Sequence, residues 1–183
     1  DPKLAKGLVK REVVRIVTPG TNCNLEALDE SKNNYLMGVV AMDDLFGISV
    51  VDVTTGEYRL TEVDGLGKLL DEINKFMPSE LICNESFYIS GVDVEDLKER
   101  LGISISSLAP HYFDQECCKK SLCRHFSVQT LDGLGLADYS VGITAAGAVM
   151  EYLEETQKTS LAHILELIPY KVGKYMLLDR NTR

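Results

Sequence analysis

Three acidic residues follow apolar segments of the sequence, a position from which carboxylates can support metal-dependent chemistry. Asp43 and Asp44 come directly after the apolar run 35–42, and Glu85 follows the short apolar segment 81–83. If both segments are neighbouring strands, the three carboxylates can hold two metal ions about 4 Å apart, as nucleases do. The same residues also fit a turn and the start of a polar loop. We keep a metal-dependent nuclease that uses Asp43, Asp44 and Glu85 as the alternative hypothesis.

Cysteine and histidine form the second group with chemical potential, because thiolates and imidazoles bind zinc and act as nucleophiles. The five cysteines are an odd number, which does not favour a disulfide framework. Zinc sites usually repeat a pair of ligands two to four residues apart, a spacing that is not found here. A reactive thiol needs a group that lowers its pKa, but Cys123 and His125 would not face each other on a helix. We therefore predict no metal ligand and no catalytic residue among Cys23, Cys83, His111, Cys117, Cys118, Cys123 and His125.

The negative net charge argues against strong DNA binding by this chain. The sequence has 19 Lys and Arg residues against 28 Asp and Glu, a formal net charge of −9, whereas binding to phosphates requires a basic surface. The one basic cluster lies near the start and consists of Lys3, Lys6, Lys10, Arg11 and Arg15. Lys10, Arg11 and Arg15 are candidates for phosphate contacts, although a solvated edge strand explains the same residues.

The composition is that of an ordinary globular protein, with 45% hydrophobic and 26% charged residues among 183. No stretch approaches the roughly 20 apolar residues that a membrane-spanning helix needs. The first residues also lack the apolar run of a secretion signal. We therefore expect no membrane contact and a cytoplasmic location. Because the sequence does not begin with Met, we expect it to start inside a larger protein.

The first secondary-structure elements that the sequence predicts are strands, and they must position the acidic residues. Residues 12–18 predict one strand. The apolar run 35–42 is typical of a strand that is buried on both faces, and residues 46–53 predict another. Residues 57–61 alternate between polar and apolar side chains, as in an edge strand. Short turns join the last three segments, so we predict an antiparallel three-stranded meander.

Helices alternate with strands after the meander. Apolar residues recur at helical spacing between Asp64, a candidate N-cap, and Pro78, which ends the helix. A short strand over 81–83, a helix over 93–101 and a strand over 103–106 follow. The helical crossovers require the last strands to run parallel to a neighbour. A meander followed by helix, strand, helix and strand is the element order of an α/β fold of the ribonuclease H-like type.

The pattern changes again after Pro110. Residues 111–127 predict a helix, and a connection that contains glycines leads to a long helix from Ser140. The small residues 145–148 of that helix permit the close approach of a neighbouring element. Residues 175–178 form a last apolar run that has little sequence after it to pack against. We therefore predict that the C-terminal part belongs to a truncated helical domain.

Several segments resemble, in the right order, the MutS family of DNA mismatch-repair proteins. The stretch 6–21, KGLVKREVVRIVTPGT, resembles the passage from the mismatch-reading domain to the connector domain of that family. Segments 152–164 and 175–183 resemble the helix that opens the core domain of the family and its continuation. Further similar segments are NNYL at 33–36, GISVVDVTTGE at 47–57 and PSELI at 78–82. Because the ordered set spans nearly the whole chain, the chain is identified as a member of this family.

The resemblance implies three parts. Residues 1–20 correspond to the junction from the missing mismatch-recognition domain and the first connector strand, 21–127 to the ribonuclease H-like connector domain, and 128–183 to a linker and the start of the truncated helical core domain. The family reads mismatches with a Phe-x-Glu motif in a region that is absent here. Its ATPase needs a loop of the form Gly-x-x-x-x-Gly-Lys-Ser/Thr, which does not occur in these residues. We therefore expect no enzyme activity and no cofactor in this chain, with ATP and Mg bound elsewhere in the parent protein.

The resemblance also implies partners. In the family, the connector links the mismatch reader to the core and takes part in docking the protein MutL after an ATP-driven rearrangement. Mismatched DNA is bound through other domains, and the parent protein is a homodimer. The acidic helix 93–101 is a candidate border of the MutL-docking surface, where charge complementarity would mainly tune the association rate. Its carboxylates are Asp93, Glu95, Asp96 and Glu99, for which a solvated outer face is the simpler explanation.

Overall fold

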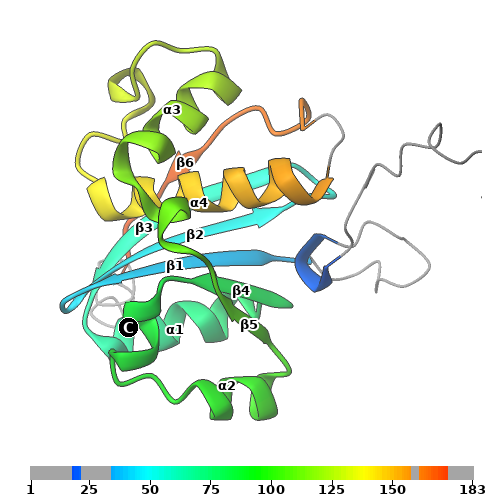
Figure 1. Ribbon diagram of the computed structural model, residues 1–183, viewed down its shortest axis with the longest axis vertical. Helices are drawn as coiled ribbons and strands as arrows, with labels where there is room; N and C mark the ends of the chain where they lie inside the picture. The colour runs from blue at the N-terminus through cyan, green and yellow to red at the C-terminus, as the bar shows by residue number, and fades with distance from the viewer. Residues whose placement is uncertain (1–17, 22–33, 158–160, 173–183) are drawn as a thin grey trace, which may run out of the picture.

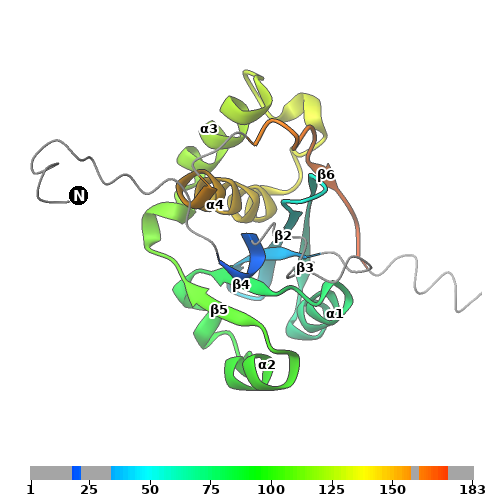
Figure 2. The same cartoon turned by 90° about the vertical axis from the view of Figure 1, so that its right-hand side faces the viewer.

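A mixed six-stranded sheet lies between two layers of helices, with α3 and α4 on one face and α1 and α2 on the other (Figures 1 and 2). This arrangement comes from a computed structural model that describes residues 18–21, 34–157 and 161–172. The strand order is β5-β4-β1-β2-β3-β6. None of the helices in the described ranges is long and apolar enough to cross a membrane.

The first three strands form the predicted antiparallel meander. They are β1 (Leu36–Met42), β2 (Leu45–Asp52) and β3 (Glu57–Asp64). Helices cover both faces of the sheet, so a central strand such as β1 reads as a continuous apolar run rather than an alternating one. Asp43 lies in the tight turn after β1 with φ 55°, a left-handed conformation that Asp tolerates better than most residues.

Helices and parallel strands follow the meander. These elements are α1 (Leu66–Phe76), β4 (Glu80–Cys83), η2 (Glu85–Ile89), α2 (Val94–Leu101) and β5 (Ser104–Ser107). Strand β4 runs parallel to β1, and β5 runs parallel to β4. This order and these directions confirm the predicted α/β fold of the ribonuclease H-like type.

The two helices of this layer begin differently. Asp93 caps α2, because its carboxylate accepts a hydrogen bond of 3.0 Å from the Asp96 amide. The cap of α1 is Gly65, which makes no side-chain cap bond. The prediction of Asp64 as that cap was wrong, since the Asp64 carboxylate instead pairs with Lys68 at 2.6 Å.

The C-terminal half supplies the second helical layer and the last strand. Its elements are α3 (Gln115–Phe126), α4 (Ser140–Gln157) and β6 (Ile168–Pro169), with short 3-10 turns at Pro110–Phe113 and Asp132–Leu134. Strand β6 pairs in parallel with β3 at the edge of the sheet. Helix α3 lies on α4, where Arg124 pairs with Glu154 at 2.8 Å.

Helix α4 lies directly against the sheet, on the C-terminal side of the boundary that we predict between residues 127 and 128. The family resemblance implies that this helix belongs to the linker and the start of a separate domain, whereas its periodicity indicates an apolar face but not which element covers that face. The small residues 145–148 are buried, as the predicted close approach requires. A Cβ atom at Gly47 in β2 would lie 2.2 Å from the Val141 carbonyl oxygen. The sheet unit therefore continues through α4.

Two apolar cores form on the two faces of the sheet. The core beneath α4 contains Leu36 and Ile82 from the sheet together with Val149 and Leu153 from the helix. The core on the other face contains Met37 and Leu81, the sequence neighbours of the first pair, together with Leu69 of α1. Successive residues of a strand point to opposite faces, so both cores share the same short strands.

Candidate functional site

The end of the sheet at which β1 and β4 begin is organised by one buried carboxylate. We call this end the amino rim and define it by Leu36, Glu80 and the segment 18–21. The Glu80 side chain is only 3% exposed. Its Oε1 atom accepts a hydrogen bond of 3.0 Å from the Gly20 amide, and its Oε2 atom accepts one of 2.5 Å from the Tyr152 hydroxyl. One side chain thus joins the segment before β1, the sheet and α4.

Strand periodicity explains why Glu80 points toward α4. Glu80 and Ile82 lie on the same face of β4, and Ile82 belongs to the core beneath α4. A charged group at such a position is tolerated when hydrogen bonds satisfy it. Burial raises the pKa of the Tyr152 hydroxyl above its usual range, and the bond to Glu80 raises it further. Tyr152 therefore stays protonated and remains a hydrogen-bond donor to the carboxylate.

The segment 18–21 fits closely against this rim. The Thr18 amide donates to the Thr21 hydroxyl at 2.9 Å, which closes a compact turn. The Asn34 side-chain amide donates to the Pro19 carbonyl at 2.9 Å. A Cβ atom at Gly20 would lie 2.9 Å from the Leu36 Cβ, so only glycine allows this approach. The segment is therefore held by backbone contacts as well as by Glu80.

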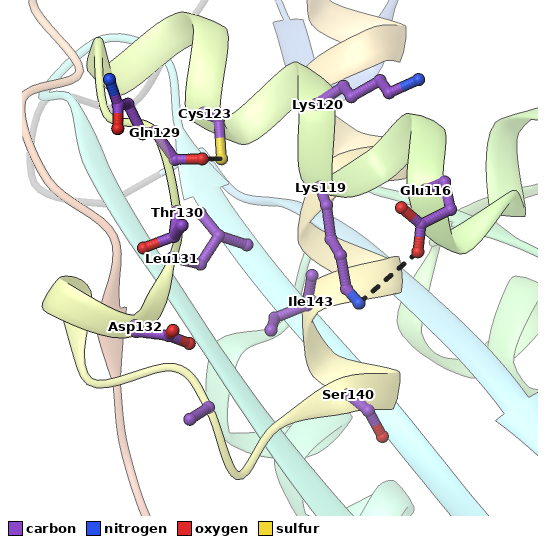
Figure 3. A pocket seen from close by; sticks show the side chains of 11 residues that line it. Glu116, Lys119, Lys120, Cys123, Gln129, Thr130, Leu131, Asp132, Ser140 and Ile143 are labelled. Atoms are coloured by element: carbon purple, nitrogen blue, oxygen red, sulfur yellow. Dashed lines mark hydrogen bonds and ion pairs between the residues drawn. The ribbon is translucent and has the colours of Figure 1, made fainter.

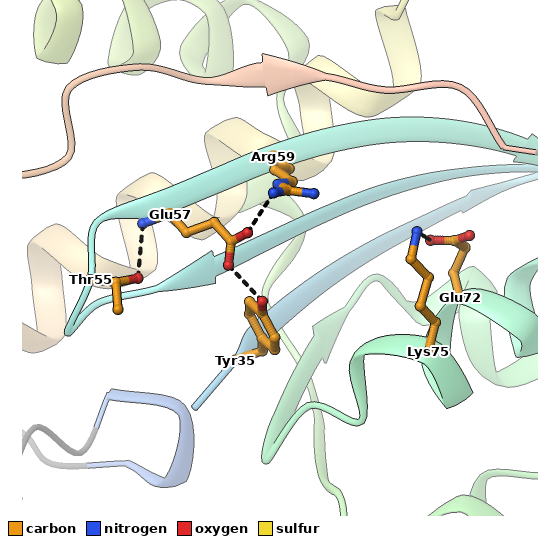
Figure 4. Close-up of polar contacts among 6 residues, drawn as sticks. All are labelled: Tyr35, Thr55, Glu57, Arg59, Glu72 and Lys75. Atoms are coloured by element: carbon orange, nitrogen blue, oxygen red, sulfur yellow. Dashed lines mark hydrogen bonds and ion pairs between the residues drawn. The ribbon is translucent and has the colours of Figure 1, made fainter. Parts of the chain in front are cut away.

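A second set of polar contacts ties the C-terminal segment to the other side of the sheet. Glu57 accepts a hydrogen bond of 2.6 Å from the Tyr35 hydroxyl and pairs with Arg59 at 2.8 Å (Figure 4). Nearby on α1, the buried Glu72 carboxylate lies 3.8 Å from Lys75 and accepts a bond of 2.9 Å from the Tyr170 hydroxyl. Tyr170 directly follows β6, so its bond to Glu72 holds that segment beside β3 and α1.

The opposite end of the sheet, where β1 and β4 end, holds the carboxylates of the nuclease alternative. We call it the carboxyl rim and define it by Met42, Asp43, Asp44 and the η2 turn. The Asn84 side chain bridges the two strands: its Oδ1 accepts from the Ala41 amide at 3.0 Å, and its Nδ2 donates to the Ala41 carbonyl at 2.9 Å.

These contacts bring Asp43, Asp44 and Glu85 to the same rim, as the alternative required. All three side chains are exposed, however, and no group of three metal-ligating side chains that could hold an ion occurs in the part of the chain that the structure describes. Glu85 begins a turn and Asp43 occupies one, which is the simpler interpretation of both. The arrangement does not favour the nuclease.

The cysteines of the described ranges have structural surroundings. Cys83 and Cys118 are buried, and burial raises the pKa of each thiol to about 12. The carbonyl oxygens of Tyr112 and Thr144 both lie within hydrogen-bond distance of the Cys118 thiol, whose single hydrogen they share, and the contact with Thr144 links α3 to α4. Cys117 is exposed, and its hydrogen bond with Asp114 raises the pKa of its thiol. A nucleophilic thiol needs a lowered pKa, so these three residues do not suit catalysis.

The four carboxylates of the predicted docking helix are exposed on α2. Three of them have partners within the helix: Asp93 caps it, Asp96 pairs with Arg100 at 3.0 Å, and Glu95 lies 3.9 Å from Lys98. Glu99 makes no ion pair with another described residue. The helix therefore presents less free charge than its composition indicates.

A cavity of about 440 Å³ lies on the other helical layer, between α3, the connection after it and α4. Leu131 and Ile143 supply apolar lining, while Lys119 and Lys120 come from α3 (Figure 3). Lys119 pairs with Glu116 at 3.7 Å. This cavity was not predicted, because its walls come from segments whose packing the sequence does not report.

Three predictions fall outside the described residues. They are the basic candidates Lys10, Arg11 and Arg15, the apolar run 175–178, and the strand predicted over 12–18, of which only Thr18 is described. Conversely, the Glu80 contacts were missed, although Glu80 is a charged residue that opens an otherwise apolar strand. That contrast was a usable signal for a buried carboxylate, but not for its partners.

Comparisons with known proteins agree with the resemblance seen in the sequence. Residues 34–165 match the family described as MutS domain II. The chain is 56% identical over 183 residues to the DNA mismatch repair protein MutS of Lachnoclostridium phytofermentans. This alignment covers 100% of this chain and 20% of that protein. The MutS proteins of Acetivibrio thermocellus and Ruminiclostridium cellulolyticum are 42% and 41% identical over 186 residues, again with 100% of this chain and 21% of theirs. The chain thus spans about a fifth of the length of these relatives.

Among solved structures, the RuvC protein of T. thermophilus in complex with a Holliday junction substrate aligns with a TM-score of 0.43 and 13% identity, over 68% of this chain and 98% of that one. The family match is the decisive finding, because it covers more than half of the chain and includes both β4 and α4. The chain therefore belongs to the MutS family of DNA mismatch-repair proteins and contains domain II of that family.

Proposed function

We propose that this domain is a connector that relays movement between the mismatch-reading part and the ATP-hydrolysing part of a mismatch-repair protein. The observation that supports it is the Glu80 carboxylate, which bonds the Gly20 amide on one side and the Tyr152 hydroxyl on the other. The first contact holds the segment before β1, and the second holds α4. A shift of either segment stretches its own hydrogen bond to Glu80, and a carboxylate that follows that segment strains its hydrogen bond to the other.

The energetics suit a relay better than a passive spacer. A buried carboxylate that loses one of its two hydrogen bonds is left partly unsatisfied, which costs roughly 1–3 kcal/mol. Glu80 therefore couples the two segments, because arrangements that satisfy both of its hydrogen bonds have the lower free energy. Coupling between sites requires such a shared element, whose state both sites bias.

The test uses the full-length protein with Tyr152→Phe or Glu80→Gln. We expect each variant to retain mismatch binding and basal ATP hydrolysis within about twofold, because those sites lie elsewhere, while the effect of a mismatch on ATP turnover falls. Tyr112→Phe is the matched control, since the Tyr112 hydroxyl also contacts a carboxylate of α4, Glu155, but not the segment 18–21. An undiminished mismatch effect in Tyr152→Phe and Glu80→Gln would rule out the relay.

The same proposal assigns no catalysis to this domain. ATP and Mg bind outside these residues, and mismatched DNA is held by other parts of the parent homodimer, which acts in the cytoplasm. Lys10, Arg11 and Arg15 remain candidates for phosphate contacts near the mismatch reader. Magnesium- or manganese-dependent cleavage of branched or hybrid substrates is expected to be absent, and cleavage that Asp43→Asn abolishes would restore the nuclease alternative.

The connector also contributes to docking of MutL, with α2 as the border of that surface. The supporting observation is the exposure of Asp93, Glu95, Asp96 and Glu99 on one short helix. Glu95→Lys together with Glu99→Lys in the full-length protein is expected to reduce recovery of MutL in a pull-down. Unchanged recovery would exclude α2.

The cavity beside α3 provides a second surface to compare with α2 in the MutL pull-down. Lys119→Glu together with Lys120→Glu reverses two charges on the opposite helical layer, so the pair of variants separates the two surfaces. Loss of MutL only in the α3 variant would move the docking site to the cavity, and would leave the relay through Glu80 untouched.

A further inference from the structure

Three segments that are distant in the sequence meet at the carboxyl rim. The Asn84 side chain holds the end of β4 to Ala41 in β1. The Gly65 amide donates to the Asp44 carbonyl at 2.8 Å, which brings the start of α1 to the turn after β1. The start of α1 also reaches the end of the η2 turn, because a Cβ at Gly91 would lie 3.6 Å from the Leu66 side chain. The turn after β1, the start of α1 and the η2 turn therefore border one surface.

Large apolar side chains are exposed on this surface. Met42 is 57% exposed, Tyr88 is 41% exposed and Ile89 is 86% exposed. They are half of the large exposed apolar side chains in the described ranges, the others being Met77, Leu165 and Ile168. Apolar side chains that gather in this way, rather than occurring singly, mark interaction sites more often than chance.

The charge of the surface is negative and largely unopposed. Asp43, Asp44 and Glu85 are exposed, and none of them forms an ion pair within the part of the chain that the structure describes. Lys68, near the start of α1, is already paired with Asp64 at 2.6 Å. Such a surface repels phosphates, which excludes nucleic acid and anionic lipid as the binding partner.

We propose that this carboxyl-rim surface, formed by Met42, Asp43, Asp44, Glu85, Tyr88 and Ile89, docks a segment of a partner protein that combines Lys or Arg with large apolar side chains. The apolar trio would supply contact area, and the carboxylates would select a basic segment and speed its association. The surface is separate from the Glu80 contacts, which lie at the opposite end of β1 and β4. Its apolar groups come from β1 and the η2 turn rather than from α2. Burial raises the pKa of the Tyr88 hydroxyl, and Glu95 of α2 lies close enough to raise it further, so the two surfaces are neighbours.

The test measures binding of a labelled synthetic peptide to the full-length protein by fluorescence anisotropy. The probe is a peptide of about twelve residues that mixes Lys with Leu, and a second peptide carries Glu in place of Lys. We expect only the Lys peptide to bind, and its affinity to fall steeply with salt because the attraction is electrostatic. Binding of both peptides with equal affinity would overturn the proposal.

Two variants locate the binding, and a matched pair controls for it. The double variant Ile89→Ser with Glu85→Gln is expected to lower the affinity for the Lys peptide at least fivefold. The double variant Asp43→Asn with Asp44→Asn is expected to lower it about threefold. Leu165→Ser with Glu166→Gln removes the same chemistry, one exposed apolar side chain and one exposed carboxylate, far from this rim and is expected to change nothing.

All substituted side chains are exposed, so each variant should fold, and unchanged thermal unfolding would establish this. Equal affinity of the Lys peptide for the wild type and both rim variants would contradict the proposal, as would an equal loss in the Leu165/Glu166 control.

Discussion

The two ends of the central strands use carboxylates in opposite ways. At the amino rim, Glu80 is buried and both of its oxygens accept hydrogen bonds from distant parts of the chain. At the carboxyl rim, Asp43, Asp44 and Glu85 are exposed and form no ion pair with a described residue. Residue type alone would rank the second group as the chemical site. Burial and partners reverse that ranking, because a buried carboxylate holds its neighbours in place while an exposed one remains free for an incoming partner.

The largest effect is expected where α4 meets the sheet, because both rims depend on that contact. Gly47→Ala would place a Cβ 2.2 Å from the Val141 carbonyl oxygen and force backbone apart. We expect a loss of at least about 3 kcal/mol in the free energy of unfolding, or a failure to fold. Gly67→Ala is the control, since its Cβ would meet nothing within 4 Å on α1. A stable Gly47→Ala protein would show that α4 does not belong to the sheet unit.

The next effect separates the two rims directly. Glu80→Ala leaves the Gly20 amide and the Tyr152 hydroxyl without an acceptor, so we expect a loss of about 2 kcal/mol in urea unfolding. Asp43→Asn with Asp44→Asn should change the free energy of unfolding by less than about 0.5 kcal/mol, because exposed substitutions usually do. Equal losses at the two rims would remove the distinction between them.

A smaller effect is expected when only one bond of the amino rim is removed. Tyr152→Phe deletes the hydroxyl that donates to Glu80 and should cost about 1 kcal/mol. Tyr112→Phe deletes an exposed contact with Glu155 and should cost less. Thermal unfolding of the two variants side by side measures the difference. A greater loss in Tyr112→Phe would place the stabilising contact on the outer side of α4 instead.

The smallest expected effect is a dependence on alkaline pH. Burial, and then the bond to Glu80, raise the pKa of Tyr152 in the folded protein. Above pH 10, the phenol ionises in the unfolded chain while it stays protonated in the folded one, so the unfolded state binds fewer protons and stability falls as pH rises. The advantage of the wild type over Tyr152→Phe should therefore be complete below pH 10 and shrink above it. A constant difference from pH 8 to pH 11 would contradict the assignment.

Periodicity was sufficient to predict most of the sheet unit. The apolar run of β1, the meander and the helical spacing of α1 and α2 are local patterns, and each appears in the structure within a few residues of its predicted position. The position of α4 was not predictable in the same way. Its small residues indicated a close neighbour, but only the folded chain identifies β2 as that neighbour, through Gly47 and Val141.

The candidate site was harder to predict than the fold. Asp43 and Asp44 were singled out because acidic residues after a strand can bind metals, yet their turn accounts for them. Glu80 was overlooked, although its charge stands out in the strand ELIC. Its partners lie 60 residues before it and 72 residues after it in the sequence. No local pattern contains contacts at such separations, so the site emerges only from the tertiary structure.

The central claim is that Glu80 couples the segment 18–21 to α4, and amide hydrogen exchange tests it most directly. The full-length protein is compared with Tyr152→Phe, with Tyr112→Phe as the control. Loss of the Tyr152 hydroxyl should free the Glu80 carboxylate and speed exchange both in α4 and in the segment 18–21, where the Gly20 amide bonds the same carboxylate. Faster exchange confined to α4, with the segment 18–21 unchanged, would contradict the account.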